Sequence, residues 1–499
     1  MAFDEPESPL TPEQGMPFRP YELPPLIPPA SREPFWLALL GLACFLGLLG
    51  MIWWSHRAAG DAQSASFQTS VKARINTYLV EMLLYHREHG KPPAWASETM
   101  NIEELATRTA DDWRSVSEEG TDAKLQGLTA LNAAALYGVT GNTVSAQAML
   151  DRAARRDPER KAQYRALLPL YAGAPRPIRL TEPIRDMLMK ISAGPLVQAH
   201  NARLLGKSGD VSAALQSGAR AGQRLILVSG VILLLFIFTV LGMLVALIIR
   251  GPRLAKAVGE MERTPGAEVP WGIGTGLIVI SLSYFTIFFV KSVLAILVTK
   301  GNADTELMLD LLSNLLGPLC IISLFLAALG RKPWEWGLLG WTPSRRGIRY
   351  GVLALALALP IVMGASYLSG RVFGDQQGAN PLISDMLTAR NPLLLLMIVV
   401  TAAVVAPLME ETLFRGILFR AANVRLPFWA AAFGSGLIFA SGHYLLVALL
   451  PITLLGMLFA FLTRRSQSLL ASAGAHTAYN GMITAVVLLT SWALNGPGS

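Results

Sequence analysis

Long apolar runs that lack charged residues recur along this chain. A bilayer core about 30 Å thick needs roughly 20 predominantly apolar residues in helical form, so such runs predict membrane-spanning helices. There are nine candidate runs, at 35 to 54, 225 to 249, 271 to 292, 307 to 329, 348 to 367, 393 to 414, 428 to 444, 445 to 463 and 469 to 492. We therefore predict an all-α fold, a polytopic membrane helix bundle.

The composition supports a membrane protein. Hydrophobic residues make up 52% of the 499 residues and charged residues 15%, and the mean hydropathy is +0.43. A net charge of +8 is compatible with binding nucleic acid, but the basic residues are dispersed and many flank the apolar runs. We expect the lipid bilayer as a partner and no nucleic acid.

Basic residues gather after every second predicted span, within 250 to 263, 331 to 349, 415 to 425 and 464 to 465. Loops on the cytoplasmic side carry an excess of Lys and Arg, so all four clusters are expected there. The N-terminus is then cytoplasmic, and the region from 56 to 222 lies outside the cytoplasm.

The segments outside the apolar runs differ in character. Residues 1 to 34 are rich in proline and have no apolar periodicity, which predicts a disordered cytoplasmic tail before a first transmembrane anchor at 35 to 54. In 56 to 222, apolar positions recur at helical spacing, which predicts a soluble extracytoplasmic α-helical domain. The spacing from Tyr137 to Pro158 resembles half of a tetratricopeptide hairpin, so a degenerate repeat and a generic bundle both stay open. Such a surface is typical of a domain that binds a protein partner.

Eight of the nine spans fall within 223 to 499, and an acidic pair lies in the sixth span near its predicted cytoplasmic end. An ionisable residue in the bilayer core costs about 2.5 to 3.5 kcal/mol, so Glu410 and Glu411 indicate a functional site. Successive helical residues point about 100° apart, so we expect the two carboxylates to face different targets. Arg415 follows Glu411 by four residues, which predicts an ion pair and leaves Glu410 to face a cavity. Taken alone, the cluster fits an interfacial salt bridge at a helix end.

Two of the six histidines lie in neighbouring apolar spans. Helical spacing places Phe439 and His443 on one face of the seventh span, and His476 and Asn480 on one face of the ninth. A single histidine in an apolar helix is more often a hydrogen-bonded packing residue than a catalyst. Three polar sets on three neighbouring spans favour a functional site instead.

The three sets together resemble the CPBP family of membrane proteins, which includes the type II CAAX prenyl endopeptidases and Abi-type bacterial relatives linked to bacteriocin immunity. The family pattern is Glu-Glu-x-x-x-Arg, then Phe-x-x-x-His, then His-x-x-x-Asn. This sequence matches it at Glu410, Glu411, Arg415, Phe439, His443, His476 and Asn480. The resemblance covers a motif core from 393 to 490, and its eight-helix count extends it back to 223.

The resemblance implies an intramembrane endopeptidase that hydrolyses a peptide bond in a membrane-associated protein or peptide, at the inner (plasma) membrane of a bacterium. Glu410 would then activate water, His443 would help to hold it, and His476 and Asn480 would stabilise the oxyanion. The supporting residues of the pattern are Glu411, Arg415 and Phe439.

Other interpretations stay open. A divalent metal such as zinc on Glu410, His443 and His476 would match the ligand types of catalytic zinc sites. The polar residues could instead only hold the bundle together, in a non-catalytic scaffold or immunity-type factor whose outer domain binds partners. A transporter is a third interpretation, because buried carboxylates also relay protons.

One geometric difficulty concerns the depth of His443. It comes 15 residues after Phe428, or about 22 Å along a helix, whereas Glu410 is expected near the membrane surface. A seventh helix that starts below the surface, or that bends, would bring the two level. We also expect a short broken segment from Tyr444 to Pro451, buried among other helices.

Overall fold

The computed structural model describes part of the chain: residues 33–59, 61–88, 101–119, 123–171, 208–263, 266–297, 303–373, 386, 391–443 and 445–495. Nearly all of the predicted tail, 1 to 34, lies outside the described residues. Where the chain is described, it forms helices and turns and no strand, which confirms the predicted all-α fold.

The described residues include seven helices that are long and apolar enough to cross a membrane. These candidate spans are Leu215–Arg253, Ile273–Leu294, Leu307–Ala328, Gly347–Phe373, Pro392–Arg425, Leu446–Ser466 and Leu469–Leu494. Two shorter apolar helices, Phe35–Met51 and Phe428–Ser441, correspond to the first and seventh predicted runs. The protein is an integral membrane protein with a polytopic helix bundle.

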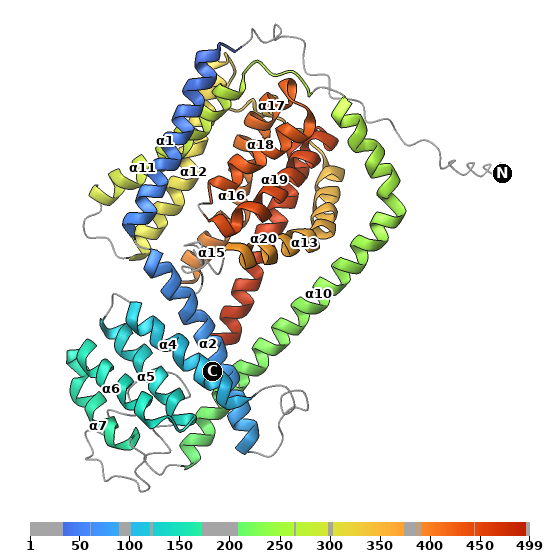
Figure 1. Ribbon diagram of the computed structural model, residues 1–499. Coiled ribbons are helices and arrows are strands. Elements are labelled where there is room, and N and C mark those ends of the chain that lie inside the picture. The colour runs from blue at the N-terminus through green and yellow to red at the C-terminus, as the bar shows by residue number, and fades with distance from the viewer. Residues whose placement is uncertain are drawn as a thin grey trace, which may run out of the picture.

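The helices at the lower end of Figure 1 pack around a core of their own. They are α2 (Asp61–Glu88), α4 (Ile102–Glu119), α5 (Ala123–Val139), α6 (Thr143–Arg156), the 3-10 turn η1 (Pro158–Arg160) and α7 (Lys161–Tyr171). From α4 to α7 each packs against the next, and Leu131, Leu136 and Leu150 are buried in their shared core. None of the seven candidate spans lies among these helices. We call them the outer helices.

Two long helices connect the outer helices to the membrane bundle. α10 (Ser208–Arg263) begins against α2, where Ala219 is buried beside Met82 and Leu83, and continues through a candidate span. The predicted domain boundary at 222 to 223 therefore falls inside a continuous helix. α20 (Leu469–Asn495) reaches the same place from the bundle, because Leu494 is buried in a cluster with Tyr78 of α2.

One side of the bundle consists of α1 (Phe35–Ala59), α11 (Ile273–Leu297) and α12 (Ala303–Ala328) (Figure 1). α1 packs closely on α11 because Gly41 meets the backbone of Gly274, where a Cβ would clash. The carboxylate of Glu33 caps α11 by accepting from the backbone N–H of Gly274 at 3.1 Å and of Thr275 at 2.7 Å.

The other side of the bundle contains a continuous helical segment from 392 to 425. It consists of α15 (Pro392–Val400), the π-helical turn η3 (Thr401–Val405), α16 (Ala406–Glu410), the π-helical turn η4 (Glu411–Phe419) and α17 (Arg420–Arg425). The predicted end of this span at 414 is wrong. The charged residues that suggested an end contact other protein groups: Arg415 pairs with Glu411, and Arg420 donates to the carbonyl of Leu338 at 2.6 Å.

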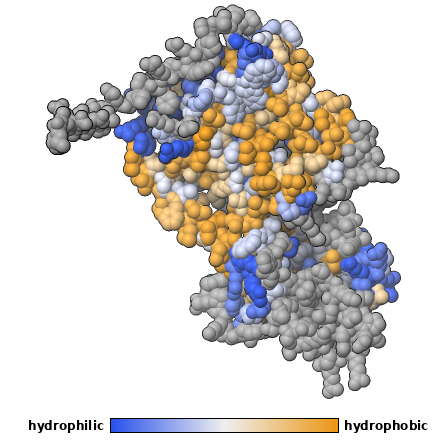
Figure 2. Space-filling view, turned by 180° about the vertical axis from the view of Figure 1, so that it is seen from behind, coloured by the Kyte–Doolittle hydropathy of each residue, from blue (hydrophilic) through white to orange (hydrophobic). Residues whose placement is uncertain are grey.

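Two further helices, α18 (Phe428–Ser441) and α19 (Leu446–Ser466), pack against this segment. α13 (Arg345–Phe373), which follows the 3-10 turn η2 (Trp336–Leu339), packs against α19 and α20. Hydrophobic side chains cover much of the upper body in Figure 2, with hydrophilic ones at its upper end and around the outer helices. On α10 alone, Leu233, Leu235 and Phe238 are more than half exposed. An apolar surface of this extent fits contact with lipid and not with water.

Candidate active site

The segment that carries Glu410 and Glu411 departs from a regular α-helix just before them. Pro407 has no backbone N–H and its ring crowds the carbonyl four residues earlier, so the wider π-helical turn η3 precedes it. The side-chain amide of Asn480, on α20, donates to the carbonyl of Ala402 in this turn at 2.9 Å. Asn480 therefore ties α20 to η3, and its predicted role at an oxyanion stays a prediction.

Glu411 and Arg415 form a buried ion pair at the start of η4. Nη1 of Arg415 lies 3.1 Å from Oε1 of Glu411, and both side chains are 0% exposed. The guanidinium group also lies over two aromatic rings, 4.4 Å from the centre of Phe439 and 5.2 Å from that of Phe459. An ion pair and two ring faces together stabilise a charge that would otherwise be costly to bury.

His476 lies between the two carboxylates. Its Nδ1 is 3.1 Å from Oε1 of Glu411, and its Nε2 is 3.5 Å from Oε2 of Glu410. The expectation that the two carboxylates face different targets is therefore wrong. An imidazole ring has a nitrogen on each of two edges, so carboxylates that point in different directions can reach the same ring from two sides.

Glu410 is the accessible member of the acidic pair. Its side chain is 21% exposed, whereas that of Glu411 is 0% exposed. A base that activates water must be reachable by water and substrate, so this difference favours Glu410 for that task. Glu411 is enclosed and holds the ring of His476.

His443 lies in the turn that follows α18. Its Nδ1 is 3.2 Å from the carbonyl oxygen of Phe439, so Nδ1–H donates there and Nε2 keeps its lone pair. The Phe439 ring meets His443 at 5.0 Å between ring centres and His476 at 5.6 Å, in both cases edge to face. Phe439 thus brings both candidate histidines against one aromatic ring.

The expected difference in depth between Glu410 and His443 does not occur. Because α17 extends to Arg425, Glu410 lies 15 residues before the end of its segment, and His443 lies 15 residues after Phe428, where α18 begins. The two residues are therefore a similar number of residues from the turn between their helices, and a sunken or bent α18 is not required.

The predicted broken segment from Tyr444 to Pro451 is shorter in the structure. α18 ends at Ser441 and α19 begins at Leu446, and Pro451 lies inside α19. Tyr444 itself lies outside the described residues. Pro451 is the sixth residue of α19, so its missing N–H removes the hydrogen bond to the carbonyl of Val447.

The family model for the type II CAAX prenyl endopeptidase Rce1-like proteins matches residues 392–482. The chain carries an Rce1-like domain. This match confirms the resemblance to the CPBP family and supports a CAAX-type protease at the level of the family. It runs from the start of α15 into α20 and includes every candidate site residue. No curated protein and no solved structure matches the chain.

The Rce1-like domain does not bring the three predicted metal ligands together. Across the described part of the chain, no three His, Cys, Asp or Glu side chains are arranged so that they could hold a metal ion. Nδ1 of His443 contacts the Phe439 carbonyl, which leaves its Nε2 available as a ligand. The ligand set of Glu410, His443 and His476 for zinc stays a prediction.

Several residues that support the Rce1-like site were not singled out from the sequence. Phe459 of α19 stacks on His476 with 4.8 Å between ring centres and an angle of 25° between the rings. A Cβ on Gly456 would lie 2.6 Å from the Cα of Gly436, so these glycines allow α18 and α19 to approach closely. Two glycines in neighbouring apolar helices are a usable signal for close packing, whereas Phe459 looks like any other apolar residue.

Proposed function

We propose that this protein is an intramembrane endopeptidase of the CAAX type, which hydrolyses a peptide bond in a membrane-associated protein or peptide. The observation that carries the proposal is the pair formed by Glu410 and His476 inside the Rce1-like domain. Glu410 is partly exposed, and the imidazole beside it is held from its other edge by the buried Glu411.

In this mechanism Glu410 takes a proton from water while the water oxygen bonds to the carbonyl carbon of the substrate. The ring of His476 then donates from Nε2 to the oxyanion that forms. The carbon–nitrogen bond breaks as Glu410 passes its proton to the leaving amine. Each proton returns, so Glu410 and His476 end in the states in which they began.

His443 and Asn480 have different tasks in the proposal. The lone pair at Nε2 of His443 can accept a hydrogen bond from the water, because Nδ1 is engaged by the Phe439 carbonyl. Asn480 acts as a positioning residue, since its amide ties the helix that carries His476 to the π-helical turn η3.

The test is hydrolysis of a quenched membrane-peptide library by the purified protein in nanodiscs, with cleavage sites read by mass spectrometry. Glu410→Gln keeps the shape of the side chain but removes the base, so we expect at least a hundredfold loss of rate with little change in thermal stability. Glu268→Gln changes an exposed carboxylate and serves as the matched control. Equal rates in the parent and Glu410→Gln would overturn the assignment of Glu410.

The proposal includes an orientation, with the N-terminus in the cytoplasm of a bacterial cell and the outer helices on the opposite side of the inner membrane. The support is the distribution of basic residues after alternate spans. A reporter that is active only in the cytoplasm should be silent when fused near Asn142 and active near Arg464. The reverse pattern would invert the orientation.

A second candidate is a non-catalytic scaffold whose outer helices bind a protein partner. It is favoured by the fact that the buried contacts of Glu411 and Arg415 join η4 to α18, α19 and α20, as a structural network would. If the parent cleaved no peptide in the library while remaining folded, this candidate would replace the endopeptidase.

A further inference from the structure

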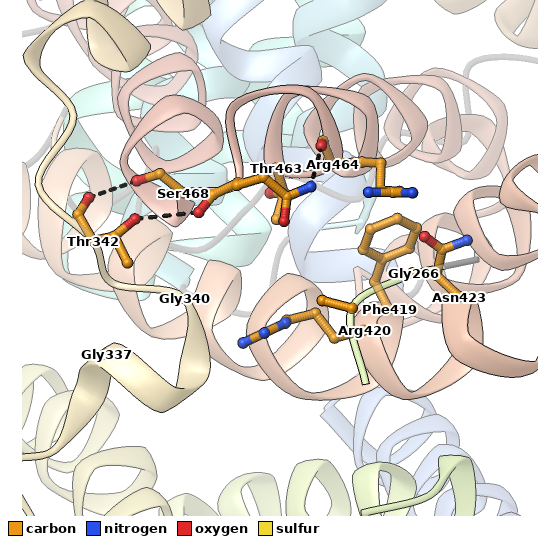
Figure 3. Close-up of a pocket in the computed structure, with 12 residues that line it drawn as sticks. Gly266, Gly337, Gly340, Thr342, Phe419, Arg420, Asn423, Thr463, Arg464 and Ser468 are labelled. Atoms are coloured by element: carbon orange, nitrogen blue, oxygen red, sulfur yellow. Dashed lines mark hydrogen bonds between the residues drawn. The ribbon is translucent and has the colours of Figure 1, made fainter. Parts of the chain in front are cut away.

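A pocket separate from the candidate active site lies where four membrane helices begin or end (Figure 3). Its walls come from residues that precede α11, from the loop after η2, from the last turns of the 392–425 segment and from the turn between α19 and α20. It contains about 620 Å³ of space that no atom fills, which includes its opening to solvent. None of the residues that line it is acidic.

Two arginines line this pocket. Figure 3 shows Arg420 extending toward Gly340 and Arg464 extending toward Asn423, so the two guanidinium groups extend in opposite directions. Nη1 of Arg420 donates to the carbonyl of Leu338, and Arg420 forms no ion pair with a carboxylate of the described residues. A largely enclosed guanidinium without an acidic partner is costly, and an anion in the pocket would offset that cost.

Asn423 supplies an independent indication of a ligand. It lines the same pocket, is only 3% exposed, and its side-chain oxygen has no hydrogen-bond partner among the described residues. A buried polar atom without a partner costs about 1 to 3 kcal/mol. An occupant that donates an N–H or O–H to Asn423 would remove this cost, so the pocket suits a ligand that combines an anion with a donor.

We propose that this pocket binds a phosphate-type oxyanion that carries a neighbouring hydroxyl or ammonium group. Arg464 binds the phosphate oxygens by charge-assisted hydrogen bonds, Asn423 accepts from the donor, and Arg420 adds positive charge to the pocket. A phospholipid headgroup such as phosphatidylglycerol has both features, and so does a soluble phosphate ester. The ends of the membrane spans are the level at which headgroups lie, which places the lipid within reach.

The pocket is distinct from the hydrolytic centre. Arg420 follows Glu411 by nine residues, and Gln467 precedes His476 by nine. None of the residues that line the pocket is a candidate site residue. The inference therefore does not depend on the proposed function, and the two can fail separately.

The experiment measures thermal unfolding of the detergent-purified full chain during titration with four probes: phosphatidylglycerol, phosphatidylcholine, glycerol 1-phosphate and inorganic phosphate. The matched variants are Arg464→Gln in the pocket and Arg465→Gln beside it. Arg465 is exposed and does not line the pocket, and its substitution removes the same charge. We expect saturable stabilisation of the parent and of Arg465→Gln, and at least a tenfold weaker apparent affinity in Arg464→Gln.

The probes identify the source of the phosphate. If phosphatidylglycerol stabilises the protein and neither phosphatidylcholine nor glycerol 1-phosphate does, the pocket binds a lipid headgroup. If glycerol 1-phosphate stabilises it in addition to phosphatidylglycerol, the pocket binds a free phosphate ester. Asn423→Leu removes the contact with the donor, so it should weaken the binding of phosphatidylglycerol and of glycerol 1-phosphate. The binding of inorganic phosphate should stay unchanged. Equal affinity in Arg464→Gln and the parent, or an equal loss in Arg465→Gln, would overturn the proposal.

Discussion

The outer helices and the Rce1-like domain both consist of packed helices, but they hold their charges in opposite ways. In the outer helices Arg152 and Glu118 form an ion pair at 2.8 Å with 30% and 40% of the side chains exposed. In the Rce1-like domain Arg415 and Glu411 form one at 3.1 Å with 0% of either exposed. Water screens the first pair, and only protein groups can satisfy the second. A buried pair of this kind can hold an imidazole in one orientation, which is why we propose that hydrolysis takes place in the Rce1-like domain.

The two regions nevertheless both contact α20. α20 carries His476 and Asn480 near its start, and its far end packs on the outer helices, where Leu494 is buried beside Tyr78 and Leu225. His476 and Leu494 are 18 residues apart, or about 27 Å along the same helix. The outer helices therefore hold one end of the helix that presents the candidate catalytic histidine.

The largest effect is expected from a substitution that breaks the buried ion pair. Arg415→Met leaves Glu411 buried without its partner, so we expect a loss of about 3 to 5 kcal/mol in the free energy of unfolding, together with loss of hydrolysis. The same substitution in the outer helices, Arg152→Met, should cost no more than about 1 kcal/mol. Denaturant unfolding of both variants in mixed micelles measures the difference. Similar losses in the two would mean that the contrast between the regions is wrong.

The sequence predicted the helices of the membrane bundle because a bilayer imposes a length and a composition that can be read directly. Helical spacing also predicted that Phe439 and His443 lie on one face of a helix, and their rings meet at 5.0 Å between centres. The sequence did not predict the end of the 392–425 segment. An arginine usually marks the edge of a span, and nothing local shows that Arg415 is enclosed by protein.

The contacts of the site were harder to predict than its members. That His476 bridges two carboxylates depends on how α20 packs against η4, and Phe459 contributes through ring stacking alone. Neither leaves a pattern in the sequence. The pocket lined by Arg420 and Arg464 was likewise not foreseen, because its walls come from segments far apart in the chain.

A smaller effect is expected where the two regions meet. Leu494→Ala removes a side chain buried between α20 and the outer helices, so we expect hydrolysis to fall about three- to tenfold and stability to fall by about 2 to 3 kcal/mol. Leu489→Ala makes the same change on the same helix at a side chain that is 46% exposed, and both properties should stay at the parent level. The rates are compared at a temperature at which both variants are folded. Parent-like hydrolysis in Leu494→Ala would show that the outer end of α20 does not influence the site.

The smallest effect concerns a contact confined to the outer helices. The hydroxyl of Tyr137 donates to Oδ1 of Asp111 at 2.6 Å, and burial, together with Asp111, raises the pKa of Tyr137 to about 12. Tyr137→Phe removes this bond and should cost about 1 kcal/mol of stability. Tyr164→Phe removes a longer bond, 3.3 Å to Asp157, and should cost less.

Tyr137→Phe also has a pH signature. Between about pH 10 and 12 the unfolded chain releases the phenolic proton of Tyr137 while the folded chain keeps it, so the stability of the parent falls as pH rises through this window. Phenylalanine has no such proton, so the decline should be less steep in Tyr137→Phe. Hydrolysis at neutral pH should match the parent, since Tyr137 contacts neither α20 nor the site. A change in the rate of hydrolysis would mean that the outer helices influence the site through more than the end of α20.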